Sequence, residues 1–123
     1  MTIGEAIAYI DRIKPNGYTQ GDKVMWLSRL DGRVKDEIID THEGAIAVMF
    51  DGYTDATPET TELLVPEPYD SIYPLWLEAQ IDYANGETVR YNNAITTFSS
   101  EYQAYERFYH RTHDPIGTQI KFF

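Results

Sequence analysis

The chain has 123 residues and a formal net charge of -10, from 20 acidic and 10 basic side chains. This length is typical of one small domain, and 42% hydrophobic residues provide enough apolar mass for a core, so disorder throughout is not expected. The negative charge argues against a general binder of nucleic-acid phosphates and against adhesion to anionic membranes, because both need clustered Lys and Arg side chains.

The sequence contains no cysteine. This excludes disulfides, thiolate nucleophiles and cysteine-based metal sites. No window approaches the roughly 18 consecutive apolar residues of a membrane span, and the first residues lack the pattern of a signal peptide. We therefore expect a protein that is cytoplasmic or is assembled from the cytoplasm.

Apolar residues at helical spacing predict two helices in the first third of the chain. The first covers about residues 2–13, with Thr2 as its N-cap and one apolar face formed by Ile3, Ile7, Ile10 and Ile13. The second covers about residues 19–40, where Thr19 and Asp22 resemble a capping box. Its apolar side chains recur every three or four residues, at Val24, Leu27, Leu30, Val34 and Ile38.

The helical period is lost in residues 41–67, which we interpret as a β or loop insertion. Residues 45–50 form a short apolar run bounded by glycines, which is typical of a strand. We expect this run to pair with residues 62–65 as a short β-hairpin.

Two further helices are predicted over about residues 70–85 and 87–112, followed by a tail over residues 114–123. The last helix carries a heptad-like stripe of Tyr91, Ile95, Phe98, Tyr102, Tyr105 and Tyr109. Such a stripe is more typical of core than of a base-stacking surface, although its hydroxyls also suit a surface covered by another subunit. The predicted fold class is mainly α: a single domain (1–123) with a small bundle of about four helices and a short β-hairpin insertion in the middle.

Charge is segregated along the chain. Thirteen of the acidic residues and none of the basic ones lie between Lys35 and Arg90, so this middle segment carries -13 and the remainder +3. Oppositely charged faces of this kind can meet head-to-tail in an assembly.

No motif supports an enzyme. His110 and His113 are spaced i, i+3 near Asp114, which permits metal ligation, but solvated histidines at a helix C-terminus have the same pattern. No serine lies in a Gly-x-Ser-x-Gly motif, no glycine-rich phosphate loop occurs, and the middle acids lack the order of a calcium loop. We predict no catalytic residue, no cofactor and no metal.

Three stretches of the sequence resemble a small protein encoded by phages and prophages of Firmicutes, which is similar to the head-tail connector (adaptor) family of long-tailed bacteriophages. These stretches are KPNGYTQGDKVMWLSRLDGRVK (14–35), LLVPEPYDSIYPLWLEAQIDYANGE (63–87) and RYNNA (90–94). The resemblance covers nearly the whole chain from Thr2 to His113.

This resemblance implies a structural subunit of the virion neck, present in the host cytoplasm during assembly. Its partners would be copies of itself in a ring, typically of twelve, together with the portal protein and a neck or tail-completion protein. It implies neither specific nucleic-acid binding nor a membrane. By position, the subunit and portal contacts would fall on the insertion and the tail, at Ile46, Val48, Phe50, Tyr53, Leu63, Ile116, Ile120, Phe122 and Phe123.

A ring that surrounds DNA benefits from a negative lumen, because Lys and Arg would hold the phosphates. The candidate channel-facing acids are Asp51, Asp55, Glu59 and Glu62. Two alternatives remain at this point: another acidic phage interaction module, such as a tail-completion factor, and a DNA-mimic inhibitor of a host nucleic-acid enzyme.

Overall fold

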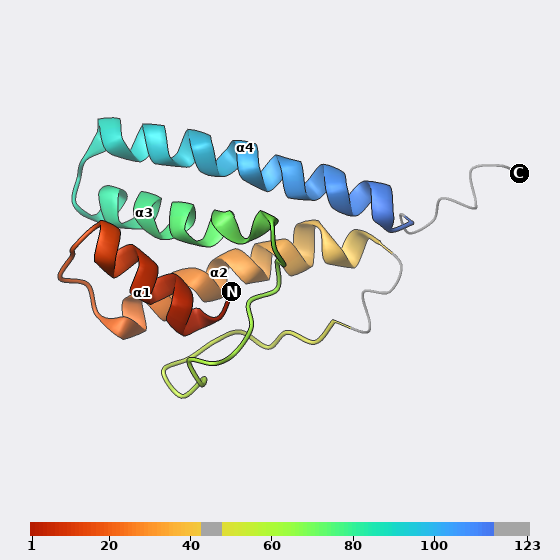
Figure 1. Ribbon diagram of the computed structural model, residues 1–123, viewed down its shortest axis with the longest axis horizontal. Coiled ribbons are helices and arrows are strands. Elements are labelled where there is room, and N and C mark those ends of the chain that lie inside the picture. The colour runs from red at the N-terminus through yellow and green to blue at the C-terminus, as the bar shows by residue number, and fades with distance from the viewer. Residues whose placement is uncertain (43–47, 115–123) are drawn as a thin grey trace, which may run out of the picture.

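The computed structural model describes residues 1–42 and 48–114 and has four α-helices, which confirms the mainly helical bundle (Figure 1). Two short 3₁₀ helices flank the insertion. In chain order the elements are α1 (Ile3–Ile13), α2 (Gln20–Glu37), η1 (Ile39–Thr41), η3 (Tyr69–Ser71), α3 (Ile72–Ala84) and α4 (Thr88–Thr112).

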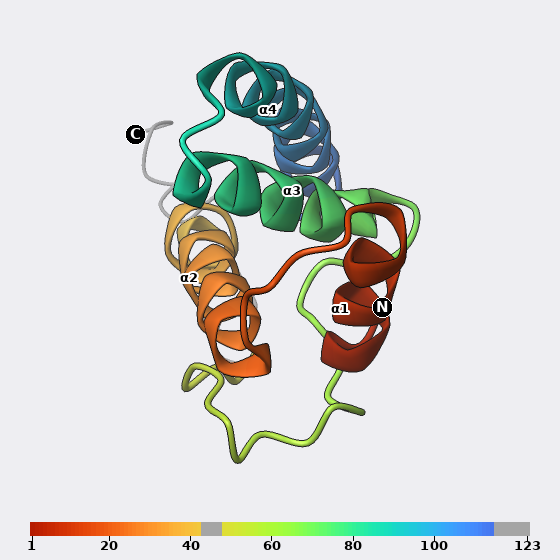
Figure 2. The ribbon, with the colours of Figure 1, turned by 90° about the vertical axis from the view of Figure 1, so that its left-hand side faces the viewer.

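Helix α3 is the centre of the bundle. It contacts α1, α2 and α4, and Figures 1 and 2 show it between α4 on one side and the layer of α1 and α2 on the other. Its buried apolar side chains are spread around much of its circumference: Ile72, Tyr73, Leu77, Ala79 and Ile81. A helix that is apolar on several sides is stable only when other elements cover those sides, which is why α3 lies inside.

Both N-terminal helices begin with capping boxes. Thr2 Oγ1 accepts a hydrogen bond from the Glu5 N–H (3.1 Å), and the Glu5 carboxylate accepts one from the Thr2 N–H (2.8 Å). Thr19 and Asp22 make the same pair of bonds at 3.1 and 3.3 Å, which confirms the predicted box with Asp in place of Glu. These bonds satisfy backbone donors that have no partner within the helix.

Two ion pairs fix the connection between α1 and α2. Lys23 Nζ, on a buried side chain, lies 2.6 Å from Asp11 Oδ1. Lys14 Nζ lies 2.6 Å from Oδ1 of Asp82, a buried residue of α3. Removal of Lys14 would leave the buried Asp82 carboxylate without its counter-charge, so this pair ties the end of α1 to α3, whereas the Asp11 carboxylate is exposed to water.

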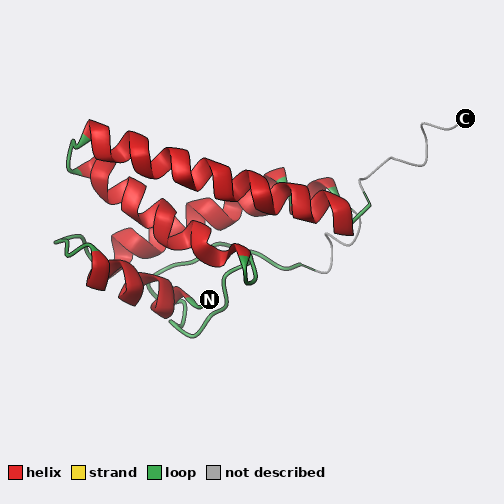
Figure 3. Ribbon diagram, turned by 45° about the horizontal axis from the view of Figure 1, so that its top comes forward, coloured by secondary structure: helices red, strands yellow, loops and turns green. Residues whose placement is uncertain are grey.

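The predicted β-hairpin is not seen. Residues 48–50 and 62–65 contain no strand, and Figure 3 draws the described part of the insertion as loop; the rest of the first expected strand, residues 45–47, lies outside the described residues. Glu62 instead forms an isolated antiparallel bridge with Thr2, and the Leu63 N–H donates to the Met1 carbonyl (3.0 Å). The second expected strand therefore finds its backbone partners at the start of the chain.

Helix α4 has 25 residues against 13 in α3. Its aromatic stripe faces inward: Phe98, Tyr102, Tyr105 and Tyr109 are buried. Near the C-terminal end the stripe packs on the 3₁₀ segments, with Tyr69 of η3 against Tyr105 (5.6 Å between ring centroids). The Tyr102 hydroxyl donates to Glu37 Oε1 of α2 (2.8 Å). The core interpretation is thus confirmed for these four residues, whereas Tyr91 and Ile95 at the start of the stripe are half-buried.

The substitution Thr19→Ala removes the oxygen that accepts the Asp22 N–H at the start of α2. We expect the free energy of unfolding, measured by urea denaturation, to fall by about 1 kcal/mol. Thr97→Ala, at an exposed position of α4, is the matched control and should change it by less than about 0.5 kcal/mol. Equal losses in the two variants would contradict a specific contribution of the cap.

Candidate functional site

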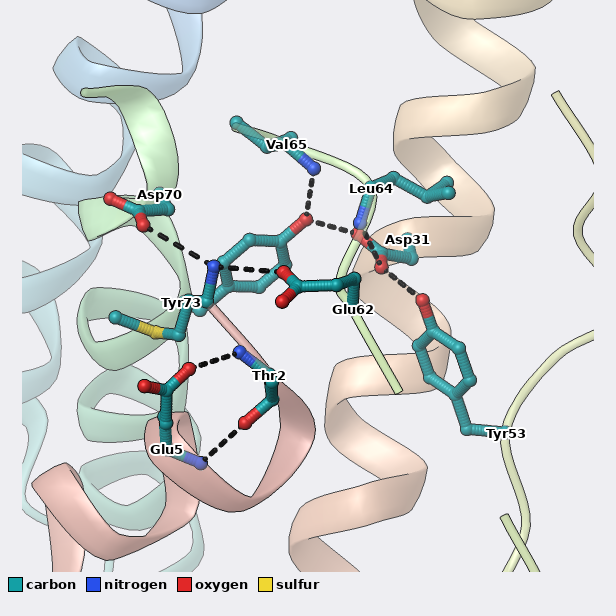
Figure 4. Close-up of polar contacts among 10 residues, drawn as sticks. Thr2, Glu5, Asp31, Tyr53, Glu62, Leu64, Val65, Asp70 and Tyr73 are labelled. Carbon is teal, nitrogen blue, oxygen red and sulfur yellow. Dashed lines mark hydrogen bonds and ion pairs between the residues drawn. The ribbon is translucent and has the colours of Figure 1, made fainter. Parts of the chain in front are cut away.

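The carboxylate of Asp31, in the middle of α2, holds the insertion against the helices (Figure 4). Its Oδ1 accepts a hydrogen bond from the Tyr73 hydroxyl of α3 (2.6 Å). Its Oδ2 accepts bonds from the Tyr53 hydroxyl (2.5 Å) and the Leu64 N–H (3.0 Å) of the insertion. The Tyr73 hydroxyl in turn accepts the Val65 N–H (2.8 Å), so four donors and two acceptors form one buried network.

Burial raises the pKa of Asp31, and the hydrogen bonds from Tyr53, Tyr73 and Leu64 offset only part of this effect. Burial also raises the pKa of Tyr53 and Tyr73, and the neighbouring Asp31 carboxylate raises both further. Both phenols consequently stay protonated and remain donors at neutral pH. The network joins α2, α3 and the insertion.

The insertion is anchored again near Tyr53. Gly52 has a φ of 88°, a left-handed conformation that residues with a Cβ rarely adopt. The turn brings the Tyr53 N–H to Ser28 Oγ of α2 (3.0 Å) while its hydroxyl reaches Asp31. A glycine is therefore required at the point where the loop returns to α2.

A third anchor lies at the start of α1. The N–H groups of Ile3 and Gly4 donate to the carbonyls of Thr61 (3.0 Å) and Glu59 (2.9 Å). The first N–H groups of a helix have no partner within it, so loop carbonyls satisfy them here. With anchors at both of its ends and in between, the described part of the insertion is a fixed surface of the bundle.

The predicted contact residues have different surroundings. Leu63 is buried in the core of its own chain, so it presents no side chain to a neighbour. Val48, Phe50 and Tyr53 are half-buried, and the rings of Phe50 and Tyr53 pack edge to face at 5.1 Å. The remaining candidates lie outside the described residues: Ile46, Ile116, Ile120, Phe122 and Phe123.

All four candidate channel-facing acids are exposed on the insertion: Asp51, Asp55, Glu59 and Glu62. Three of them also have local partners. Glu59 Oε1 accepts a bond from Gln20 Nε2 (2.9 Å), and Asp55 lies against Gly21, both in the first turn of α2, where the helix dipole favours negative charge. Glu62 Oε2 lies 3.3 Å from the α-amino group of Met1.

The structure brings His42 next to His110 and His113, which lie about seventy residues further along the chain. Nδ1 of buried His42 lies 2.6 Å from the Ile38 carbonyl, so that nitrogen donates, and its Nε2 lies 2.9 Å from His110 Nδ1. The His113 ring stacks on Tyr109 at 3.8 Å. Both nitrogens of His42 are thus engaged, and the residues described include no group of three or more His, Asp or Glu side chains placed to hold a metal ion.

Sequence reasoning missed Asp31 and His42 as contact points. The signal for Asp31 was present, because Leu27, Asp31 and Val34 follow the spacing of the apolar face of α2. A carboxylate at a core position implies buried donors around it. No comparable local signal joins His42 to α4.

Comparisons with protein-family models, curated proteins and solved structures return no match for this chain. Among the helices described, none combines the length and the apolar character that crossing a membrane requires.

The substitution Asp31→Asn replaces one acceptor oxygen by an NH₂ group that cannot accept from Tyr53 or Leu64. We expect the free energy of unfolding in urea to fall by about 1–3 kcal/mol, because buried donors lose their partner. Asp36→Asn, at an exposed position of the same helix, is the control and should change it by less than about 0.5 kcal/mol. An Asp31→Asn variant as stable as this control would contradict the anchoring role.

The raised pKa of Asp31 also gives stability a pH dependence. Above the ordinary value of 3.8 and up to the raised value, the folded chain keeps a proton that the unfolded chain has lost. Stability conferred by this group therefore falls as pH rises through that interval. We expect the stability advantage of wild type over Asp31→Asn, measured in urea from about pH 4 to pH 7, to shrink with rising pH. An advantage that grows with pH would indicate a lowered pKa instead.

Proposed function

We propose that this chain is a structural subunit of the neck of a long-tailed phage, a head-tail connector or adaptor that assembles with copies of itself beneath the portal. The resemblance of residues 14–35 and 63–87 to that family suggests the class. The observation that carries the proposal further is the anchored insertion, which exposes the four candidate acids and Glu67 and contains no Lys or Arg. A fixed acidic surface suits the wall of a channel through which DNA moves without being held.

The arrangement of charge supports contact between copies. Most of the described insertion lies on the side of the α1 and α2 layer away from α4 in two perpendicular views (Figures 1 and 2), although its start, at His42, contacts His110 in the last turn of α4. The last turns of α4 carry the exposed side chains of Arg107 and Arg111. Opposite charges on opposite sides of one subunit favour head-to-tail contacts, which close into a ring when the rotation between neighbours permits.

The test is assembly with the portal protein of the same phage. We expect the purified chain to be a monomer or weak oligomer alone and to form a ring of copies when mixed with portal, measured by native mass spectrometry and electron microscopy. The reconstruction should place residues 51–62 toward the lumen. A chain that stays separate from portal, or a ring with a basic lumen, contradicts the proposal. A chain that instead binds a basic host enzyme in a salt-dependent manner and is absent from virions would be a DNA mimic.

A charge-reversal pair tests the contact between copies. Arg107→Glu with Arg111→Glu should abolish ring formation on the portal, because the basic end of α4 becomes acidic. Arg29→Glu with Arg90→Glu changes the net charge equally at exposed positions outside that end, so its ring should form as in wild type. Loss of assembly in both pairs would show an effect of total charge alone.

A further inference from the structure

An apolar groove is lined by residues of α1, α3 and α4, with Met1 and the 3₁₀ segment η3 at its edge. Its cavity volume is about 420 Å³. Pro74 and Leu75 of the central helix α3 line it together with Tyr9 and Ile13 of α1. Tyr9 and Ile13 are 41% and 50% exposed, although both are large apolar residues. Both side chains thus meet solvent within the described chain, and exposed apolar side chains that gather at one place are typical of a binding surface.

Carboxylates border this apolar surface. Asp70 lies 3.6 Å from the α-amino group of Met1 and is compensated by it. Glu78 of α3 and Glu101 of α4 also line the groove and are half-buried. Among residues 1–42 and 48–114, neither forms an ion pair with Lys or Arg.

Basic side chains around the groove have other partners: Arg90, which lines the adjoining hollow with Glu78, lies 3.4 Å from Glu87. Lys14, which lines the adjoining hollow with Glu78, pairs with Asp82 at 2.6 Å. Arg12 lies over the ring of Tyr9, 5.2 Å from its centroid. Glu78 and Glu101 therefore depend on water for their solvation.

This arrangement determines the chemistry of whatever covers the groove. A molecule that packs on Ile13 and Leu75 also removes water from Glu78 and Glu101, and burial of an uncompensated carboxylate is costly. A purely apolar partner would leave both carboxylates buried without compensation. A partner with Lys or Arg beside its apolar side chains would replace the lost water by ion pairs.

We propose that this groove binds a segment of another protein that presents apolar side chains flanked by Lys or Arg. A second copy that docks through this same groove fits less well, because the carboxylates of the two grooves would face each other. None of the described residues that line the groove belongs to the insertion, so this inference does not depend on the proposed role in a phage neck.

The probe is a fluorescein-labelled synthetic helix made of Leu and Lys, with one leucine face flanked by lysines, and the readout is fluorescence anisotropy in about 0.1 M salt. We expect saturable binding to the full chain, and no binding of the same helix with Glu in place of Lys. Glu78→Lys with Glu101→Lys should weaken the affinity at least about tenfold. Asp36→Lys with Asp51→Lys, which makes the same change in net charge at exposed positions outside the groove, should weaken it less than about threefold.

An apolar pair of variants tests the floor of the groove. Ile13→Lys should weaken binding at least about tenfold, whereas Val89→Lys, at a 74% exposed apolar position of α4 outside the groove, should weaken it less than about threefold. Both positions are exposed, so both variants should unfold in urea close to wild type.

Several results would overturn the proposal. Equal loss of affinity in the groove variants and their controls would show attraction to the net charge only, and absence of binding to wild type would show that the groove does not accept this chemistry. A concentration-dependent dimer, seen by sedimentation and lost in Ile13→Lys, would assign the groove to a second copy. Each of these results can occur whether or not the chain forms a ring with portal, so the two proposals fail separately.

Discussion

One buried carboxylate, Asp31, holds two separate points of the insertion, Tyr53 and Leu64, against the helices. Taking Asp31 out of water is unfavourable, and it is tolerated because two phenols and a backbone N–H surround it with donors. The insertion in turn lacks a strand partner in its described part, so its own N–H groups need acceptors, which Asp31 and the Tyr73 hydroxyl provide. The insertion thus supplies donors to the Asp31 carboxylate, and Asp31 and Tyr73 supply acceptors to the backbone N–H groups of the insertion. The path of the loop, and with it the acidic surface, follows from this mutual requirement.

The helices could be predicted from sequence because their signals are local. Capping residues such as Thr19, the apolar period of α2 and the aromatic stripe of α4 lie within a few turns of the structure they specify. The hairpin prediction was wrong because apolar residues at 62–65 have the same pattern whether they pair with a strand or pack on helices. Contacts with Thr2 and Asp31, more than thirty residues distant, decided between these outcomes. For the same reason Leu63 was expected at an interface and lies in the core.

The candidate surface combines structural and functional demands. Asp55 and Glu59 stand at the start of α2, where a negative side chain is favourable for the helix itself. Two lysines, Lys14 and Lys23, form ion pairs with Asp82 and Asp11, and the Lys23 side chain is buried. The exposed surface is therefore poorer in basic groups than the composition alone indicates. The acids of the insertion can serve the helix as well as the wall of a channel. The proposed assembly therefore rests also on where the acids of the insertion and the arginines of α4 lie in the fold.

The short connection between α3 and α4 has a consequence for how the molecule folds. These helices are joined by three residues and form the most extensive helix contact of the bundle, so their pairing closes only a small loop of chain. The Thr2–Glu62 bridge instead closes a loop of about sixty residues, which costs more chain entropy and gains few contacts. It follows that folding begins with the helical hairpin of α3 and α4, and that the Thr2–Glu62 bridge forms after the core has assembled. The acidic surface of the insertion is then the last part of the chain to take its shape.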